Sequence, residues 1–270
     1  GARWGWHPEW DVRAVIVKAN DDLRQEQFAM QLITVFEQIW SEARLPLLLR
    51  PYAILATSPT AGLIEFVPDA VSLATIRSRG YGSLHAFFLA AFQGPDSPAY
   101  RAAQFAFVRS MAAYSVVCYL LQIKDRHDGN LLLDRSGAVL HIDFGYMLGR
   151  RMNEVVQFES APFKVTQDHV QVMGGPNSPG YHKYMALAIQ GFLSARQKAQ
   201  RIVGLVQTMQ VGATLPCLVG GPVVIEELLA RLGVDKTEKE CVDAFVALHQ
   251  EALGSWRTPA YDLLQKLLGM

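Results

Sequence analysis

Two side chains that can bind a metal ion flank a short hairpin pattern. Asn130 directly precedes the apolar residues 131–133, and Asp143 directly follows the apolar stretch 138–142. The residues between them, 134–137, read Asp-Arg-Ser-Gly, which predicts a turn and hence an antiparallel hairpin. A hairpin brings together the residue before its first strand and the residue after its second. We therefore expect the Asn130 amide and the Asp143 carboxylate to converge as hard oxygen donors that suit Mg²⁺ and substrate phosphates.

A carboxylate and an imidazole lie next to this predicted metal site. Asp125 and His127 occupy the loop just before Asn130, where they can orient or deprotonate a hydroxyl. Lys18, on a predicted strand, supplies a cation for phosphates, and Glu26 on the following helix can hold it as an ion pair. Either Asp-Arg-His or Asp-Phe-Gly alone is a weak signal, but the ordered set is specific and indicates phosphoryl transfer.

A small β-rich piece precedes a larger helical piece in the predicted organisation. The β-branched residues 11–19 predict a strand, and Asp22 and Gln25 have the spacing of a capping box that begins a helix. Residues 52–57 and 62–66 predict two further strands joined by a turn. From residue 71 onward the pattern is mostly helical, with helices expected at residues 83–92, 99–122, 182–209, 224–232, 236–253 and 259–268.

Composition excludes several function classes. Lys plus Arg and Asp plus Glu both number 25, and this zero net charge argues against a general nucleic-acid binder. The three cysteines form no Cys-x-x-Cys pair, which excludes a disulfide scaffold or zinc ribbon and indicates a reducing compartment. No transmembrane segment is expected, because the longest uncharged run, 202–225, is interrupted by Gly and Pro, and the run 110–123 fits a buried helix.

The ordered motifs resemble the phosphatidylinositol 3- and 4-kinase superfamily. The resemblance is carried by Val17-Lys18, by Asp21-Asp-Leu-Arg-Gln-Glu26, by Asp125-Arg-His with Gly129-Asn130, and by Asp143-Phe-Gly145. Within the superfamily the chain most resembles the beta form of the type III 4-kinases. The supporting features are Lys124 before the Asp-Arg-His triplet, residues 62–67, the short segment after Gly145, and Leu215-Pro-Cys217.

This resemblance implies an α+β, two-lobed, protein-kinase-like catalytic domain. Residues 1–66 would form a partial, β-rich N-lobe that lacks the upstream phosphate-binding loop, so a truncated catalytic domain is expected. Residues 67–270 would form a mainly helical C-lobe. The C-lobe would contain a catalytic loop at 124–130, the Asp-Phe-Gly motif at 143–145 and an activation segment at 146–165.

The resemblance also implies roles for single residues in an ATP- and Mg²⁺-dependent phosphorylation of the inositol 4-hydroxyl of phosphatidylinositol. Lys18 would contact the ATP phosphates with support from Glu26, and Asn130 and Asp143 would bind Mg²⁺. Asp125 and His127 would serve the attacking hydroxyl, and which of them takes the proton stays open. The adenine would meet backbone groups of Glu65 and Val67 and an apolar floor formed by Leu132 and Ile142.

The segment after Asp-Phe-Gly is expected to face a lipid substrate. Arg150, Arg151 and Lys164 would meet a lipid phosphate at a membrane surface, although an ordinary solvated loop fits the same residues. Location on cytoplasmic membranes, at the Golgi in particular, is implied only by the resemblance. One departure from the family is Asp128, where asparagine is usual; it adds negative charge near the predicted metal site.

Other functions compete with this interpretation. Within the enzyme class the alternatives are a 3-kinase or a related Ser/Thr protein kinase, against which Lys124 and the short segment after Gly145 argue. Outside it the alternative is a kinase-fold scaffold without activity. The presence of Lys18, Asp125 and Asn130 together argues against such a scaffold, because a degenerate site tends to lose some of these side chains.

Overall fold

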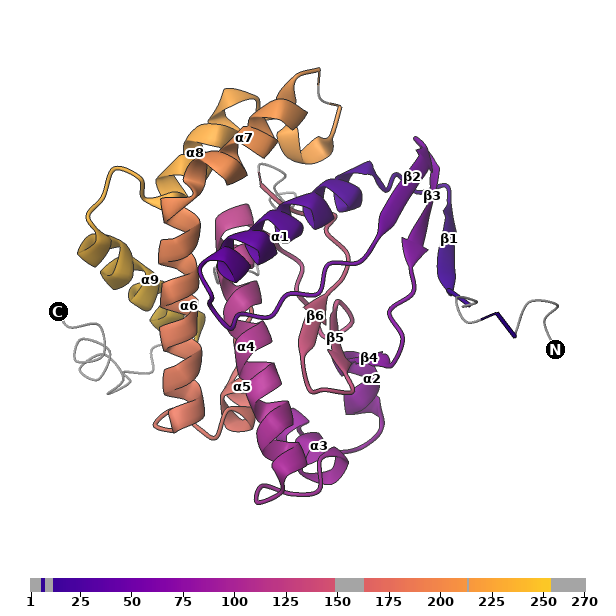
Figure 1. The fold of residues 1–270 in the computed structure, drawn as a ribbon, viewed down its shortest axis with the longest axis vertical. Coiled ribbons are helices and arrows are strands. Elements are labelled where there is room, and N and C mark those ends of the chain that lie inside the picture. The colour runs from indigo at the N-terminus through magenta and orange to yellow at the C-terminus, as the bar shows by residue number, and fades with distance from the viewer. Residues whose placement is uncertain (1–5, 8–11, 149–162, 213, 254–270) are drawn as a thin grey trace.

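The computed structural model describes residues 6–7, 12–148, 163–212 and 214–253 and combines helices with two three-stranded sheets (Figure 1). This mixture confirms the predicted α+β class. The predicted helix at 259–268 and most of the segment 146–165 lie outside the described residues.

The first sheet is antiparallel and holds the predicted strands of the N-terminal piece. Its strands are β1 (Val15–Ala19), β2 (Ile54–Ser58) and β3 (Ala61–Glu65), in the order β1-β3-β2. The register places Lys18 opposite Gly62. Since the three predicted strands all form here, alternation and turn residues were sufficient to find this sheet.

Helix α1 (Arg24–Glu42) packs beside β2 and buries an apolar face that includes Leu32, Phe36 and Trp40. The predicted capping box is wrong. The N-cap position is Leu23, without a side-chain cap, and Asp22 accepts from the Arg24 backbone N–H at 3.1 Å and from its guanidinium. Gln25 turns away from the helix start because its amide bonds to another part of the chain, described below.

The second sheet contains the predicted hairpin. Strands β5 (Leu131–Asp134) and β6 (Val139–His141) pair antiparallel, with Leu131 opposite His141. A third strand, β4 (Ala70–Ser72), pairs with β5 and was not predicted, because three residues carry no measurable periodicity.

Helices make up the rest of the described chain. The predicted helix at 182–209 is two helices, because Lys198 leaves helical geometry (φ −108°, ψ 23°) while the apolar periodicity continues through it. The helices are α2 (Leu73–Ser78), α3 (Leu84–Ala91), α4 (Pro98–Leu121), α5 (Gln167–Val172), α6 (Pro179–Gln197), α7 (Ala199–Gln210), the 3-10 helix η2 (Pro216–Leu218), α8 (Pro222–Leu232) and α9 (Glu238–Ala252).

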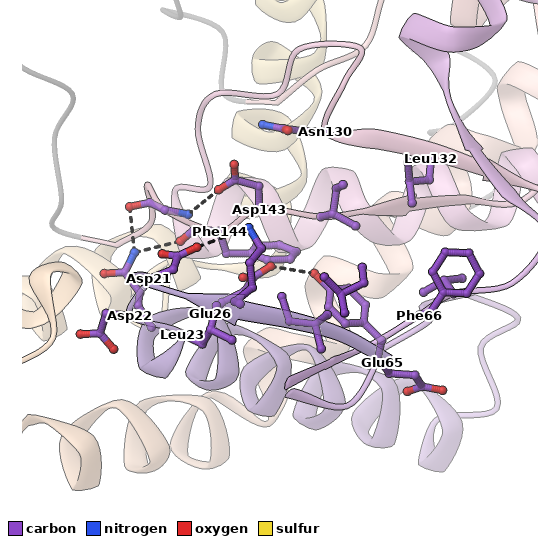
Figure 2. A pocket seen from close by; sticks show the side chains of 18 of the residues that line it. Asp21, Asp22, Leu23, Glu26, Glu65, Phe66, Asn130, Leu132, Asp143 and Phe144 are labelled. Carbon is purple, nitrogen blue, oxygen red and sulfur yellow. Dashed lines mark hydrogen bonds and ion pairs between the residues drawn. The ribbon is translucent and has the colours of Figure 1, made fainter. Parts of the chain in front are cut away.

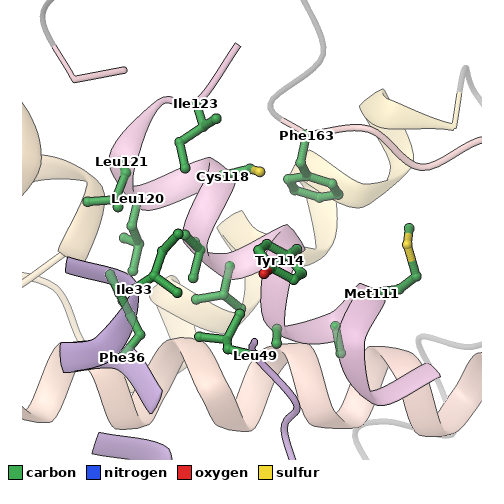
Figure 3. Packing of buried hydrophobic residues seen from close by; sticks show 14 of the residues in the cluster. Ile33, Phe36, Leu49, Met111, Tyr114, Cys118, Leu120, Leu121, Ile123 and Phe163 are labelled. Atoms are coloured by element: carbon green, nitrogen blue, oxygen red, sulfur yellow. The ribbon is translucent and has the colours of Figure 1, made fainter. Parts of the chain in front are cut away.

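Helix α4 is the centre of the larger lobe. It packs along α6 and against β6, and Figure 3 shows its side chains Met111, Tyr114 and Leu120 within the buried cluster. Among the described residues it is the one helix long and apolar enough to cross a membrane, but 72% of its apolar window is buried inside the protein. That burial is typical of a core helix, as predicted for residues 110–123.

A buried hydrogen-bond chain joins α4, α6 and α9. Ser115 Oγ lies 2.9 Å from Tyr184 Oη, which lies 2.8 Å from His249 Nε2. The other ring nitrogen, Nδ1, lies 3.0 Å from the Phe245 carbonyl oxygen. A neutral imidazole satisfies both contacts by donating from Nδ1 and accepting at Nε2. Burial lowers the pKa of His249 to about 4, so folding keeps this ring neutral.

We expect acid to destabilise the fold through His249. The pKa of this ring is about 4 when folded against an ordinary value of 6.5. Between pH 6.5 and pH 4 the unfolded chain therefore binds more protons than the folded one. The free energy of unfolding falls as the pH drops through this range. At pH 5 the loss amounts to about 2 kcal/mol. Denaturant titrations give the free energy of unfolding of His249→Gln and of wild type at each pH. The deficit of the variant relative to wild type should be about 2 kcal/mol smaller at pH 5 than at pH 7.5.

Ser115→Ala provides the matched control, since it removes a partner from the same hydrogen-bond chain but no titratable group, and should lower the free energy of unfolding equally at both pH values. A His249→Gln penalty that is the same at both pH values would contradict a neutral buried ring.

Candidate functional site

A cavity of about 660 Å³ lies between the first sheet, α1 and the hairpin. This size and its mixed apolar and polar walls suit a small organic ligand. Eight of the sequence-predicted site residues line it: Lys18, Glu26, Glu65, Val67, Asn130, Leu132, Ile142 and Asp143. Residues from positions 16 to 216 meet here, so tertiary folding assembles the site from distant segments.

The residues that line the cavity differ between its two ends. Figure 2 shows Asp21, Asp22 and Asp143 gathered toward one end, and Glu65 and Phe66 at the other. The arrangement suits an elongated ligand with a charged, metal-bound end and a flat apolar end.

The hairpin brings both predicted metal donors to the same cavity. The Ile142 backbone N–H donates to the Asn130 carbonyl at 3.1 Å, which extends the β5–β6 pairing to the residue before Asp143. The Asn130 side-chain N–H donates to the Asp125 carbonyl at 2.9 Å, which turns its amide oxygen away from that bond. Asp143 Oδ1 accepts from the Gly145 N–H at 3.2 Å. Two remaining oxygens, one amide and one carboxylate, are a donor set that fits Mg²⁺ completed by water and phosphate.

No group of three or more His, Cys, Asp or Glu side chains suited to a metal ion occurs in the described part of the chain. A metal at the cavity would therefore depend on its ligand's phosphates for further coordination.

Two of the predicted site carboxylates, one catalytic and one metal-binding, have left-handed backbone. The φ angle is +62° at both Asp125 and Asp143. Non-glycine residues rarely adopt this region, and when they do the surrounding structure holds them there, often at functional sites. Sequence patterns do not report φ, so this feature needed the structure.

The predicted ion pair between Lys18 and Glu26 does not form. Lys18 Nζ instead lies 3.4 Å from Asp21 Oδ2, and Glu26 Oε1 accepts from the Tyr52 hydroxyl at 3.0 Å. Burial raises the pKa of the Glu26 carboxyl, with a further contribution from the charge of Asp143, while Tyr52 and Lys18 act in the opposite direction. The competing partners Asp21 and Tyr52 come from a bend and from a loop, neither of which helix spacing reveals.

The apolar end has the backbone groups expected for recognition of a flat heterocycle. The Glu65 N–H donates to the Ala53 carbonyl at 2.8 Å, so it is already used within the sheet. Val67 lies just beyond β3, and its N–H makes no hydrogen bond within the described residues. Leu132 and Ile142 line the same cavity as partly buried apolar side chains.

Asp125 and His127 lie beside the cavity rather than among its lining residues. His127 is exposed, and its Nδ1 accepts the Gly129 N–H at 3.0 Å. A Cβ at position 129 would stand 2.8 Å from the His127 ring, so glycine is needed there for the ring's close approach. A neutral His127 in this geometry carries its proton on Nε2.

Arg126 is the most important site residue that the sequence did not single out. Its side chain is only 2% exposed. Its guanidinium donates to the Lys124 carbonyl at 3.0 Å, to the Ile142 carbonyl at 2.7 Å and to the Asp143 carbonyl. Arg126 therefore ties the loop 124–130 to the end of the hairpin. Its position inside the Asp-Arg-His triplet was the available signal, but charge alone favours a solvated arginine.

Gln25 links α1 to two other segments. Its amide nitrogen lies 2.8 Å from the carbonyl oxygens of Phe144 and of Gly145, and its amide oxygen accepts from the Cys217 N–H at 3.0 Å. This side chain was predicted as a cap residue, but only 6% of it is exposed, and it closes one wall of the cavity.

The predicted substrate segment is described only at its end. Arg150 and Arg151 lie outside the described residues. Lys164 is half-buried and does not line the cavity, and its neighbour Phe163 packs against the His249 ring with centroids 4.4 Å apart.

Comparison with known proteins gives a family match over most of the chain. The family described as "Phosphatidylinositol 3- and 4-kinase" matches residues 13–219. This range includes every residue that lines the cavity.

Several curated relatives align with nearly the whole chain. A phosphatidylinositol 4-kinase from Dictyostelium discoideum is 44% identical over 98% of the chain and 22% of its own length. Phosphatidylinositol 4-kinase beta 1 from Arabidopsis thaliana is 47% identical over 98% of the chain and 24% of its own length. Phosphatidylinositol 4-kinase beta from Xenopus tropicalis is 40% identical over 99% and 33%, respectively. The chain thus spans between a fifth and a third of the length of these relatives.

We expect Arg126→Lys to loosen the site, because a single ammonium cannot reach three carbonyl oxygens at once. Leaving buried carbonyls unpaired should lower the free energy of unfolding by about 2–3 kcal/mol in denaturant titrations. The control is Arg135→Lys, since the Arg135 side chain is 80% exposed and, in the described part of the chain, pairs with Asp69 alone. That change should cost less than about 0.5 kcal/mol. Equal losses for the two variants would mean that Arg126 does not hold the loop.

Proposed function

The chain belongs to the phosphatidylinositol 3- and 4-kinase family, and on this premise we propose that it transfers the γ-phosphoryl group of ATP to the 4-hydroxyl of phosphatidylinositol. The observation that carries the proposal is the alignment of 4-kinases with 98–99% of this chain, including its whole cavity. The product would be phosphatidylinositol 4-phosphate.

The cavity would hold ATP with its adenine at the Glu65–Phe66 end. The free Val67 N–H would donate to the base, and the carbonyl of Glu65 would accept from it, while Leu132 and Ile142 form the apolar floor. Lys18 would exchange its Asp21 contact for the ATP phosphates, because a phosphate carries more negative charge than one carboxylate. Glu26 stays close enough to bias that movement electrostatically.

Asn130 and Asp143 would hold Mg²⁺ through their amide and carboxylate oxygens. When bound, the metal supplies positive charge that offsets the charge developing on the phosphates. Arg126 would hold the backbone around Asp143 through the carbonyls of Ile142 and Asp143 and tie it to the start of the loop through the Lys124 carbonyl.

The hydrogen bonding of His127 favours Asp125 as the proton acceptor. In the reaction, the 4-hydroxyl oxygen forms a bond to the γ-phosphorus, the bond from that phosphorus to the β–γ bridging oxygen breaks, and ADP leaves. The hydroxyl proton needs an acceptor, and His127 Nδ1 already accepts the Gly129 N–H. His127 would therefore donate from Nε2 toward phosphate oxygens, and the Asp125 carboxylate would take the proton.

We propose the lobe boundary at residues 66/67. The first sheet ends with β3 at Glu65, and the next strand, β4, already pairs with β5 of the hairpin. The segment 146–165, with Arg150, Arg151 and Lys164, would face the lipid headgroup at a membrane surface. Location at the Golgi stays a prediction from the family resemblance.

The proposal is tested with the full-length gene product, Mg-ATP and phosphatidylinositol vesicles, by determining which inositol hydroxyl is phosphorylated. We expect the 4-phosphate, and Asp143→Ala should abolish turnover while circular dichroism shows an intact fold. Asp96→Ala, at an exposed position in the loop before α4, is the control and should keep wild-type turnover. A 3-phosphate product would overturn the substrate assignment, and wild-type rates in Asp143→Ala would overturn the metal assignment.

A second prediction separates the two candidate bases. Asp125→Asn keeps the shape but cannot accept the proton, so kcat should fall by about 10²–10⁴-fold. His127→Gln should cost less, since the glutamine amide can still donate toward phosphate, and the kcat ratio of the two variants measures the difference. A larger loss in His127→Gln would reverse the roles.

A further inference from the structure

A three-residue ionic cluster lies outside the cavity, at the back of the catalytic loop. Arg77 on α2 donates through Nε to the Asp128 carboxylate, and its Nη2 lies 3.3 Å from Asp168 Oδ2. The side chains of Asp128 and Asp168 are 24% and 18% exposed, so both carboxylates are largely shielded from water. One guanidinium thus serves two partly buried acids.

Asp128 is attached to α2 at two points. Its carboxylate pairs with Arg77, and its carbonyl oxygen accepts the Ala74 N–H at 3.0 Å. Asp128 stands between His127 and Asn130, and the His127 carbonyl accepts the Asn130 N–H at 2.9 Å. Movement of residue 128 therefore carries both neighbours with it.

Asp168 connects the same arginine to the structure beyond the activation segment. It lies in the first turn of α5, and its two oxygens accept the Leu84 N–H at the start of α3 at 3.1 and 2.9 Å. The helix begins at Gln167 with Thr166 as its N-cap, directly after the buried residues Phe163 and Val165. Arg77 thus bridges the catalytic loop and the helix that follows the activation segment.

The charge at position 128 makes this bridge necessary. An uncharged amide at this position would need no counter-ion. Asp128 adds a second carboxylate near Asp168, and two like charges in a partly desolvated place repel unless a cation lies between them. Arg77 is that cation, and its guanidinium stays charged at any working pH.

We propose that Arg77 is a positioning residue for phosphoryl transfer, which holds the catalytic loop against α5 by neutralising Asp128 and Asp168 together. The inference rests on the proposed function for its activity readout. Among the described residues, Arg77 makes no hydrogen bond or ion pair with a residue that lines the cavity, so it acts on the placement of the catalytic loop and not by contacting ATP.

The activity test compares Arg77→Met with Arg79→Met in the full-length gene product. Arg79 is exposed at the end of the same short helix and makes no ion pair among the described residues. Because small displacements of reacting groups reduce rates steeply, Arg77→Met should lower kcat about tenfold with KM for ATP within about twofold of wild type. Arg79→Met should leave both constants unchanged. A wild-type kcat in Arg77→Met would overturn the proposal.

A second substitution guards against simple misfolding. In the Arg77→Met background, Asp128→Asn removes one of the two repelling charges. The kcat of the double variant should therefore be at least about threefold higher than that of Arg77→Met. Loss of a merely structural contact would not be repaired by removing the second partner, so a double variant as slow as or slower than Arg77→Met contradicts the electrostatic role.

Hydrogen exchange separates failure of this inference from failure of the proposed function. Backbone amides in residues 125–130 should exchange faster in Arg77→Met than in wild type or Arg79→Met, whatever the enzyme phosphorylates. Faster exchange without a 4-phosphate product from the wild-type protein would refute the substrate assignment alone. Unchanged exchange in a protein that does form the 4-phosphate would refute the bridge alone.

Discussion

The antiparallel register of β5 and β6 is the constraint on which the site depends. With Leu131 opposite His141, Asn130 comes opposite Ile142, whose N–H bonds to the Asn130 carbonyl, and Asp143 follows directly. A shift by one residue would send alternate side chains to the opposite face of the sheet. The two oxygen donors would then no longer meet in the cavity. The third strand, β4, and the long core helix α4 hold this hairpin from both sides.

Buried polar side chains connect the end of this hairpin to other segments by hydrogen bonds. Arg126 bonds to carbonyl oxygens of the catalytic loop and of the hairpin end and so holds the two together. Gln25 on α1 bonds to the carbonyls of Phe144 and Gly145, which follow the hairpin. Gln25 also receives the Cys217 N–H, so one amide joins three segments that are remote in sequence. Such groups are costly to bury unless all their partners are present, and they therefore specify a single arrangement of these segments.

Electrostatics divides the surroundings of the loop into two zones. At the charged end of the cavity, Asp21, Glu26 and Asp143 outnumber Lys18 among the described lining residues, while Asp22 is paired with Arg24. This excess of negative charge suits a cation and a cation-bound phosphate. Behind the loop, Arg77 neutralises Asp128 and Asp168, so the acid at position 128 contributes less field to the metal side than its charge suggests. The departure from asparagine is thus compensated locally.

The sequence by itself determined the first sheet, most of the helices, and the hairpin that brings Asn130 and Asp143 to one cavity, because alternation, turn residues and helical periodicity are local signals. Predictions from sequence spacing were wrong where a side chain bonds to a partner outside its own helix or strand. Gln25 has the spacing of a cap residue but binds carbonyls some 120 positions away, and Glu26 is bonded to Tyr52 while Lys18 lies against Asp21. Only the tertiary structure decided these pairings, together with the burial of Arg126 and the left-handed backbone at Asp125 and Asp143. The physical reason is that a polar side chain takes the partner that burial leaves available, and burial is a property of the assembled fold.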